Sequence, residues 1–401
     1  MNFASRWPLV PLGEVVEDTQ YGTSMKANEQ GTGVPVLRMN NITYSGSIDV
    51  ADLKHVDLSE AEDERYFVRR GDLLFNRTNS QELVGKMGVW NRDERFAFAG
   101  YLVRLRLNCD RAEPRFVGAW FNTPEMKAML RARAKPSINM SNINATEVLE
   151  LSLVLPPLKE QRRIAEVLDQ AEALRAKRRA ALAQLDTLTQ SIFLDLFGDP
   201  DRGPNEWPSV MLGDVAEIIT GYPFRSQEYQ GPADGVRLCR GANVMPSRLD
   251  WSDLACWPAG RTDSMADFNL VPGDIVLAMD RPWISEGFKL AEVRASDCPA
   301  LLVQRVARLR GKTGVPNAFL LHILGQPAFA RHCRPTETTI PHISPKEIRS
   351  FTFSFPPLAL QRDFARRVAA VDKLKSAHRA SLAKLDALFA SLQHRAFRGT
   401  L

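Results

Sequence analysis

Apolar and polar positions alternate in short runs over the first 155 residues, and this pattern predicts strands. The clearest run is 101–107, where Val103, Leu105 and Leu107 alternate with two arginines. Residues 34–39 and 71–75 predict two further strands, the second entered through a Gly-Asp turn. From 116 to 134 the apolar residues recur at helical spacing and predict one helix, with the face Phe116, Trp120, Met126 and Leu130.

The same order of elements returns 200 residues later. Strands are predicted at 236–240, 273–277 and 301–309, and a helix is predicted at 318–330. The opening Trp7-Pro8 recurs as Trp207-Pro208. Of the 42 residues from 156 to 197, 16 are identical to those 200 positions later, without a gap. The chain is therefore an internal duplication.

Each copy ends in a long helix. A short apolar strand (151–155 and 351–355) runs into a double proline, which stops the strand and allows a helix to begin. The helices are predicted from about 159 to 197 and from about 359 to 397, without internal glycine or proline, and would be roughly 57 Å long. An apolar stripe with spacings of three and four follows each helix: Ile164, Leu168, Ala171, Leu182, Leu185 and Ile192 in the first, and Phe364, Val368, Val371, Leu382, Leu385 and Leu392 in the second.

Such stripes need a partner, which is either the helix's own globule or the other helix. The helices outreach a globule of this size, which favours pairing, and the pair can be parallel or antiparallel. Antiparallel pairing would give the molecule an internal pseudo-two-fold axis. Duplex DNA has two-fold axes of the same kind, and two-fold proteins read it as paired half-sites.

Composition fits a globular protein of two domains plus helices, since 401 residues exceed one ordinary core. No stretch approaches the roughly 18–20 apolar residues of a membrane span, and the start lacks the pattern of a secretory signal. Five scattered cysteines argue against a disulfide framework and for a reducing cytoplasm. The net charge of +5 is uneven, −1 in residues 1–200 and +6 in 201–401, so charge alone is weak evidence for a polyanion partner.

Several motifs, in their order along the chain, resemble one known family. The segment Leu155-Pro156-Pro157-Leu158-Lys159-Glu160-Gln161-Arg162 is similar to the motif that begins the family's first long helix. Residues 71–77 resemble the turn and strand of its target recognition domains, and Trp7-Pro8 followed by Leu12-Gly13-Glu14-Val15 is typical of its opening. The whole layout resembles the specificity (S) subunit of type I restriction–modification systems.

The resemblance implies an α+β fold in which two similar mixed target recognition domains are joined by two long helices that form an antiparallel coiled coil with pseudo-two-fold symmetry. The expected division is 1–157 for the first recognition domain, 158–198 for the first spacer helix and 199–206 for a linker. It continues with 207–357 for the second recognition domain, 358–397 for the second spacer helix and 398–401 for a tail.

The family also implies partners and a location. They are double-stranded DNA, two methyltransferase (M) subunits that dock on the helices and, where present, restriction (R) subunits, in the cytoplasm of a bacterium or archaeon. S-adenosylmethionine is expected on the M subunit, and ATP and magnesium on the R subunit, with no cofactor on this chain. The expected helix-pairing and partner-docking residues are Glu160, Gln161, Arg162, Ile164, Leu168, Leu182, Leu185, Ile192, Gln361, Arg362, Val368, Leu382, Leu385 and Leu392.

The second copy departs from the motifs of the first. It has Ala359-Leu360 where the first has Lys159-Glu160. Asp280-Arg281-Pro282 replaces Asn76-Arg77-Thr78 after an apparent insertion of two residues. These differences put the equivalence of the two docking surfaces in doubt.

The sequence offers no credible catalytic site. Pro156-Pro157 and Pro356-Pro357 lack the Asn/Asp and the aromatic residue expected of an adenine methyltransferase, and Gly311-Lys312-Thr313 lacks the first glycine of a P-loop. Histidine and cysteine do not have metal-ligand spacing, so no metal is expected. A carboxylate–lysine nuclease pattern of Asp110, Glu125 and Lys127 stays open as a third hypothesis.

The polar loops are better candidates for DNA contact. Direct readout uses Arg or Lys for guanine and Asn or Gln for adenine, while many polar contacts go to phosphate. The candidates are Ser24, Lys26, Arg38, Asn40, Asn41, Asn76, Arg77, Thr78, Asn79, Lys135, Ser137 and Asn139 in the first copy, and Arg225, Ser226, Arg240, Asn243 and Arg281 in the second.

The leading hypothesis is a non-catalytic DNA-reading subunit that scaffolds methyltransferase and restriction subunits at a bipartite, asymmetric target. The alternative is a coiled-coil scaffold that never binds DNA. The basic run 175–179 fits either a solvated helix face or contact with a polyanion.

Overall fold

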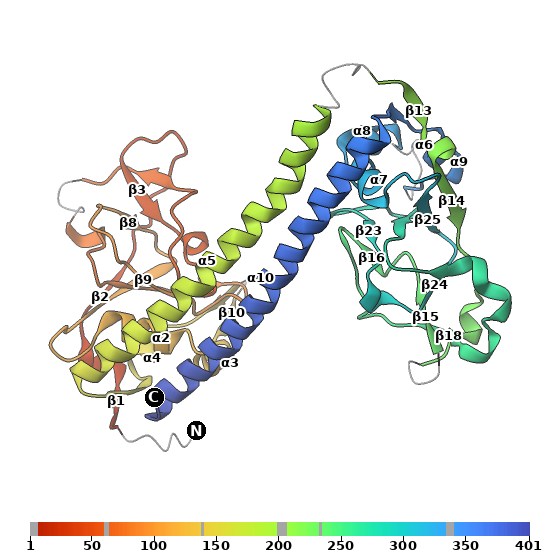
Figure 1. Ribbon diagram of the computed structural model, residues 1–401. Coiled ribbons are helices and arrows are strands. Elements are labelled where there is room, and N and C mark those ends of the chain that lie inside the picture. Colours follow the sequence, from red (N-terminus) through yellow and green to blue (C-terminus); the bar gives the residue numbers. More distant parts are fainter. Residues whose placement is uncertain (1–6, 60–63, 138–139, 199–206, 232–234, 334–340) are drawn as a thin grey trace. The chain divides into compact units, whose positions relative to one another are not determined.

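The first globule is built on two sheets that share no strand (Figure 1). The computed structural model describes residues 7–59, 64–137, 140–198, 207–231, 235–333 and 341–401. One antiparallel sheet has the order β2 (Val16–Tyr21), β9 (Leu102–Leu107), β5 (Leu73–Asn76), β7 (Met87–Val89). The other has the order β4 (Lys54–Val56), β3 (Val34–Leu37), β8 (Ala97–Phe98).

Smaller strand pairs complete this globule. β6 (Thr78–Asn79) pairs with β11 (Met140–Asn142), which pairs with β10 (Lys135–Ser137). β1 (Leu9–Pro11) pairs with β12 (Ser152–Val154), which leads into the long helix α5 (Leu158–Phe197). The short helix α4 (Ala145–Leu149) lies between β11 and β12 in the chain.

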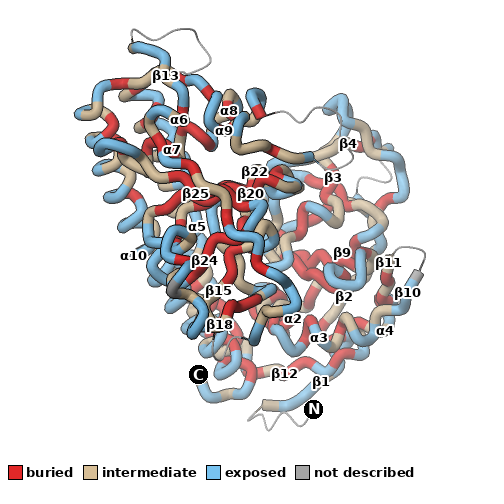
Figure 2. The backbone as a smooth tube through the Cα atoms, turned by 90° about the vertical axis from the view of Figure 1, so that its right-hand side faces the viewer, coloured by how far each residue is buried: buried red, intermediate tan, exposed pale blue. Residues whose placement is uncertain are grey.

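The second globule repeats the strand order of the first. Its larger sheet runs β14 (Ala216–Thr220), β25 (Val306–Gly311), β20 (Ile275–Ala278), β23 (Leu290–Glu292), and Figure 2 shows β20 and β25 buried. The other sheet runs β18 (Cys256–Pro258), β15 (Gly235–Cys239), β24 (Ala300–Leu302), β19 (Asn269–Leu270). β13 (Ser209–Met211) pairs with β26 (Thr352–Ser354), as β1 pairs with β12.

Additional short elements lie in the connections of this globule. Two small hairpins are β16 (Val244–Met245) with β17 (Arg248–Leu249) and β21 (Trp283–Ile284) with β22 (Gly287–Phe288). The helices are α6 (Leu212–Val215), α7 (Asn317–Leu324), α8 (Pro327–His332) and α9 (Pro345–Ser350). The second long helix, α10, spans Leu358–Arg398.

The helix predicted from 116 to 134 is two helices, so that prediction is wrong in its continuity. α2 spans Pro114–Phe121 and α3 spans Pro124–Arg133. The break has a local cause, because Thr123 is extended and its hydroxyl accepts a hydrogen bond from Met126 N, which starts α3 with Pro124 in its first turn. The predicted helix 318–330 is likewise divided into α7 and α8.

The strand predicted from 301 to 309 is also two strands, β24 and β25, in different sheets. Arg305 interrupts it with φ 75°, a left-handed conformation that does not belong to a strand. The alternation of apolar side chains continues through the break and hides it. The other predicted strands (34–39, 71–75, 101–107, 236–240, 273–277, 151–155 and 351–355) are confirmed as elements with shifted ends.

The chain divides into two compact units, and the division cuts both long helices. One unit holds residues 1–180 and 379–401, and the other holds 181–378. Each globule's core is therefore closed by the start of the helix that follows it and by the end of the other helix. Ile164 and Phe397 lie in the first core, and Phe364 and Phe197 lie in the second.

The helices pair antiparallel within each unit. In the first, Arg163 donates to Leu401 O at 3.0 Å, and Arg175 bonds Asp386 at 2.7 Å. In the second, Lys375 Nζ lies 3.0 Å from Asp186, and the rings of Phe193 and Phe364 are 5.7 Å apart. Residue numbers rise along α5 as they fall along α10 in both cases. This confirms the α+β fold with two similar globules and antiparallel long helices.

Candidate nucleic-acid interface

Two exposed tyrosines and a half-buried arginine gather where three strands of the first globule end or begin. We call Tyr21, Arg77 and Tyr101 the first edge. Arg77 N donates to Tyr101 O at 3.1 Å, and the Arg77 guanidinium lies 5.0 Å from the centre of the Tyr21 ring. Tyr21 and Tyr101 are 40% and 49% exposed. A guanidinium next to an aromatic ring presents a planar set of hydrogen-bond donors, which suits recognition of a base or a phosphate.

A glycine next to each edge allows two backbone segments to cross closely. A Cβ on Gly22 would lie 2.3 Å from Ala99 O, and one on Gly221 would lie 2.2 Å from the carbonyl carbon of Val303. Each glycine N donates to the first residue of the neighbouring strand, Leu102 or Val306. The same crossing therefore shapes the edge of both globules.

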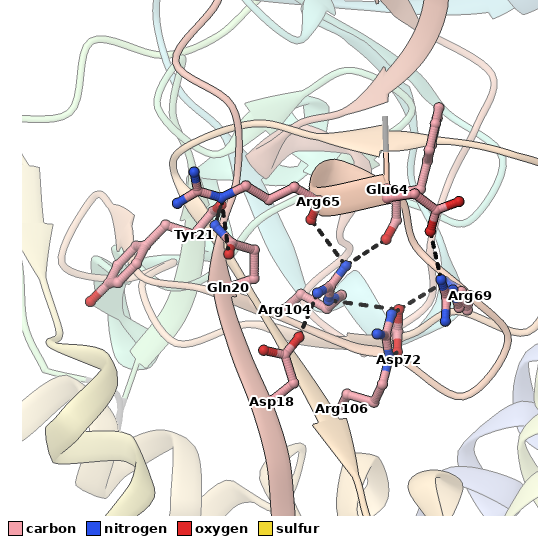
Figure 3. A network of polar contacts seen from close by, with 10 residues as sticks. Asp18, Gln20, Tyr21, Glu64, Arg65, Arg69, Asp72, Arg104 and Arg106 are labelled. Atoms are coloured by element: carbon pink, nitrogen blue, oxygen red, sulfur yellow. Dashed lines mark hydrogen bonds and ion pairs between the residues drawn. The ribbon is translucent and has the colours of Figure 1, made fainter. Parts of the chain in front are cut away.

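A buried ionic network fixes the strands behind the first edge (Figure 3). Arg104 is 4% exposed and donates to Asp18 at 2.5 Å and to Phe67 O at 2.7 Å. Asp72 accepts two hydrogen bonds of 2.9 Å from Arg106, and this pairing raises the pKa of the Arg106 guanidinium. Since buried charges need such partners, the network orders the loop from 64 to 69 against β9.

The second globule has the same network. Arg308 donates to Glu217 at 3.0 Å and to Asp267 O at 2.9 Å. Arg310 donates to both oxygens of Asp274, which raises the pKa of its guanidinium. A rigid support behind each edge is thus a common feature of the two globules.

Two asparagines predicted to contact DNA hold a loop instead. Asn41 is 3% exposed, and its amide donates to Asp49 O and Asp52 O at 2.9 Å. Asn243 is 1% exposed and makes the same two bonds, to Asp250 O and Asp253 O. We therefore correct their expected role, because neither amide is free to meet a base.

The arginine before each asparagine belongs to the same loop. Arg38 lies 3.1 Å from Asp52, and Arg240 lies 3.1 Å from Asp253. A buried lysine supports the loop from below, since Lys86 Nζ donates to Met39 O at 2.7 Å and Lys289 Nζ donates to Gly241 O. Burial lowers the pKa of both lysines. The arginines keep one exposed side but are committed to intramolecular ion pairs.

Asn76 and Asn79 also lie inside the globule, 0% and 7% exposed, with Asn79 Nδ2 donating to Asn76 Oδ1 at 3.2 Å. The Nδ2 of Asn76 is buried without a hydrogen-bond partner among the described residues, and the expected DNA contacts of this pair stay predictions. Thr78 is half-buried in β6.

The remaining candidates differ in exposure. Lys135 pairs with Glu147 at 2.6 Å, which raises the pKa of the lysine. Ser137 ends β10, and Asn139 lies outside the described residues. The side chains that stay exposed are those of Ser24, Lys26, Asn40, Lys135, Arg225, Ser226 and Arg281.

We call the corresponding part of the second globule, with Met279, Arg281 and Arg305, the second edge. It does not contain the insertion inferred from the sequence. Met279 N donates to Arg305 O at 2.9 Å, and Ile343 N donates to Met279 O at 2.8 Å. These are the bonds that Arg77 makes with Tyr101 and Ile143 in the first globule, so Met279 occupies the position of Arg77. Arg281 is exposed with φ 45°, and Arg305 supplies a second guanidinium at this edge. Sequence reasoning missed Arg305, because it placed that residue inside a continuous strand.

The residues expected to pair helices or dock partners fall into three groups. The stripe residues are buried or half-buried, as the pairing requires: Ile164, Leu168, Leu182, Leu185, Ile192, Val368, Leu382, Leu385 and Leu392. Glu160, Arg162 and Arg362 lie at the helix starts, where Glu160 pairs with Arg163 at 2.6 Å and Arg162 approaches Glu113 at 3.8 Å.

Gln161 and Gln361 form the third group and are wholly buried. Gln161 accepts from Glu113 N and donates to Arg111 O and Pro156 O. Gln361 donates to Pro356 O at 2.7 Å. Gln161 thus fastens its helix start to the first globule, whereas the side chain of Gln361 bonds, among the described residues, only a proline that precedes its helix, and their expected pairing and docking role stays a prediction.

Four of the five exposed leucines of the long helices mark a different surface, and the fifth is Leu194. Leu174 and Leu388 are 53% and 50% exposed in the first unit, and Leu188 and Leu374 are 40% and 51% exposed in the second. Each directly precedes a half-buried position of the helix pairing, for example Arg175 or Phe389, whose side chains meet at 4.4 Å. In an antiparallel pair, the two leucines of a unit therefore flank the same side of the pairing. We call these pairs the leucine patches.

The nuclease pattern does not assemble. Lys127 Nζ donates to Tyr44 O and lies 4.0 Å from the Tyr44 ring, and burial lowers its pKa to about 8. Glu125 and Asp110 are exposed. Among the described residues there is no group of three His, Cys, Asp or Glu that could hold a metal ion. None of the helices described there is long and apolar enough to cross a membrane.

Comparisons with known proteins agree with this architecture. The protein-family model described as the type I restriction modification DNA specificity domain matches residues 4–184 of this chain. The putative type I restriction enzyme MjaX specificity subunit of Methanocaldococcus jannaschii is 26% identical over 92% of this chain and 87% of its own. The EcoKI specificity subunit of Escherichia coli is 30% identical over 46% of this chain and 40% of its own.

Solved structures share the fold over almost the whole length. The S subunit of a type I restriction–modification system from M. genitalium has a TM-score of 0.61 at 13% identity, covering 98% of this chain and 96% of that one. A chain from a study of assembly and conformational transition of the type I R-M system has a TM-score of 0.54 at 20% identity and covers 98% of both chains. With its duplicated globules and antiparallel helices, this chain is similar over most of its length to type I restriction–modification specificity subunits.

Proposed function

We propose that the chain reads a bipartite, asymmetric duplex DNA target, one half with each globule, and holds methyltransferase subunits on its helices. The observation that carries the proposal is the repetition of one rigid edge with different side chains. The first edge offers Arg77 on Tyr21, and the second offers Arg281 and Arg305. Two similar scaffolds with unlike polar edges suit two unlike half-sites.

Binding to duplex DNA tests this proposal against a scaffold that never binds DNA. The purified chain, alone and with its M subunit, is titrated with a randomised duplex between about 50 and 200 mM salt. Phosphate contacts predict an affinity that falls linearly on a log–log plot with salt, by roughly 0.9 per neutralised phosphate. Binding that is absent, or does not depend on salt, would favour the protein scaffold.

The chain itself is proposed to catalyse nothing, with S-adenosylmethionine bound by the M subunit and ATP and magnesium by any restriction subunit. The lone chain incubated with S-adenosylmethionine and duplex DNA is expected to transfer no methyl groups, and the complex with its M subunit is expected to do so. We propose that the chain acts in the cytoplasm, where the chromosome lies. Methyl transfer by the lone chain would overturn this part of the proposal.

The leucine patches are the proposed contacts for the M subunits, one subunit for each unit of the chain. Large exposed apolar side chains on the same side of a helix pair are typical of partner surfaces. Leu174→Ser with Leu388→Ser should reduce the complex from two M subunits to one, measured by mass in solution, with little change in thermal stability. Lys177→Ser, an exposed position on the same helix, is the control and should keep both subunits.

A further inference from the structure

We propose that three equivalent backbone positions select the preferred base pair in each globule. They carry Thr78, Tyr101 and Asn142 in the first and Asp280, Arg305 and His342 in the second. In the second globule, Arg305 is the guanine-reading side chain, and Asp280 and His342 are its positioning residues. This inference rests on the proposed function and names the residues that carry it out.

Backbone hydrogen bonds establish the equivalence. Tyr101 O and Arg305 O each accept from the residue after the central strand, at 3.1 and 2.9 Å. Thr78 pairs with Asn142 in an antiparallel ladder, and Asp280 forms an antiparallel bridge with His342. The two edges therefore share one backbone frame at these positions. Side chains of different chemistry on a common frame are what two different specificities require.

In the second globule the three side chains form one polar chain, in which Asp280 and Arg305 carry opposite charges. His342 Nδ1 lies 2.6 Å from Asp280 Oδ1, and Asp280 Oδ2 lies 3.6 Å from Arg305 Nε. Arg305 is 57% exposed, and its Nη1 and Nη2 make no hydrogen bond within the described part of the chain. The carboxylate thus holds the inner side of the guanidinium and leaves its outer donors available.

The backbone of Arg305 supports the same interpretation. Its φ of 75° lies in the left-handed region that disfavours non-glycine residues, and such strain persists where the surrounding structure enforces it. Arg305 O is held by Met279 N at 2.9 Å. The strained turn directs an arginine to the exposed edge at a fixed place, next to its carboxylate partner.

The first globule has no such charged pair at these positions. Thr78 and Asn142 are uncharged and half-buried, and Tyr101 offers a ring and a hydroxyl with 49% of its surface exposed. Its guanidinium comes instead from Arg77, on the Tyr21 ring. The base pair read at this position should therefore differ between the half-sites.

A guanine contact needs more geometry than a phosphate contact. Arginine reads guanine O6 and N7 through two parallel hydrogen bonds, so its plane must be fixed. The ion pair between Asp280 and Nε restrains that plane, whereas a phosphate contact needs only the charge. The two roles of Arg305 are therefore separable by experiment.

The test uses the full chain assembled with its M subunit. A randomised duplex library gives the preferred target, and duplexes with single base-pair changes give the preference at each position. Arg305→Lys keeps the charge and should lower the preference for guanine at one base pair of one half-site by about 10-fold. Arg248→Lys, another exposed arginine of this globule, is the control and should leave every preference unchanged.

The same measurement, the preference for one base over the others at each base pair, tests the positioning residues Asp280 and His342. Asp280→Asn and His342→Gln should relax the preference at that base pair by a smaller factor, with an unchanged melting temperature. The triple variant Asp280→Thr, His342→Asn, Arg305→Tyr should move the preference to another base while the other half-site keeps its own. A purely structural role would not change one base pair selectively.

Two results would overturn the inference, and they differ from failure of the proposed function. If Arg305→Ala weakens all duplexes equally and lowers the salt slope by about 1, then Arg305 contacts phosphate. If the conservative Arg305→Lys variant binds with every preference intact, Arg305 reads nothing. Loss of the proposed function would instead appear as a wild-type complex without sequence preference.

Discussion

At the scale of single residues, His322 shows how the second core treats a titratable group. Its ring lies 4.3 Å from the ring of Phe193 and 5.3 Å from that of Phe364, and its Nε2 is buried without a hydrogen-bond partner in the described part of the chain. Burial lowers its pKa from 6.5 to about 4. The residue therefore packs as a neutral aromatic side chain.

This burial predicts a stability that depends on pH. The unfolded chain protonates His322 near pH 6.5, whereas the folded protein does so only near pH 4. The unfolded state binds more protons between these values, so stability is complete above pH 6.5 and is lost as the pH falls toward 4, by up to about 3 kcal/mol. Urea unfolding at pH 7.5 and 4.5, followed through the transition of the second unit, measures the loss in the free energy of unfolding.

His322→Leu should make that loss smaller, because leucine does not titrate. His394→Gln, at an exposed position, is the control and should lose as much as the wild type. Equal losses for His322→Leu and the wild type would show that carboxylates alone cause the acid sensitivity.

Residue types predicted the polar loops, but they did not distinguish residues available to contact DNA from residues that support the loop. Asn41 and Arg77 have equally suitable chemistry for bases, yet the Asn41 amide is used up by Asp49 O and Asp52 O. Those bonds depend on a loop conformation that no sequence pattern specifies. The left-handed Arg305 was missed for the same reason.

At the scale of elements, the pairing of the long helices contains charged side chains at related positions. Arg175 is 18% exposed and bonds Asp386, and Lys375, which lies 200 residues later, is 12% exposed and bonds Asp186. Charges in a helix seam lower stability relative to well-packed apolar residues but restrict which partners and registers are acceptable.

Replacing both cations with leucine should therefore keep or raise the melting temperature and promote self-association through the helices. Thermal scans and sedimentation of Arg175→Leu with Lys375→Leu measure the two effects. Asp186→Asn with Asp386→Asn is the matched comparison, since it removes the carboxylate that each cation meets on the other helix, leaving Arg175 only Glu172 of its own helix, and should lower the melting temperature by a few degrees. The idea fails if the leucine variant melts below the asparagine variant and stays monomeric.

The long helices were predictable as elements because their apolar spacing is regular over many turns and proline marks their starts. Shorter elements were less so. The spacing of Phe116, Trp120, Met126 and Leu130 continues across a break, although Pro124 is a visible signal for it. The N-cap at Thr123 begins a new helix there, although the helical spacing of the apolar residues continues.

At the scale of the whole molecule, each globule depends on both helices. The rings of Phe116 and Phe397 lie 5.3 Å apart in the first core, and Phe197 and Phe364 lie 5.6 Å apart in the second. The duplication was visible in the sequence, because it needs only a comparison of the chain with itself. These core contacts were not, because they join residues far apart in the chain, without local sequence signals.

Because the helices belong to both units, their length should set the gap between the half-sites. Inserting one heptad into α5 after Ala180 and one into α10 after His378, at the division between the units, adds about 10.5 Å to each helix and keeps the heptad phase. We expect the assembled complex to accept a gap longer by about three base pairs, at 3.4 Å each, with unchanged bases in both half-sites. Selection from a duplex library with variable gaps measures both quantities.

The control is a heptad inserted into α5 alone. The two helices then differ in length, so the ends of α10 cannot fill both cores at once, and stability should fall. If the double insertion leaves the gap constant, or changes the bases before the gap, then the helices do not act as the spacer. The recognised interval would then depend on the globules themselves.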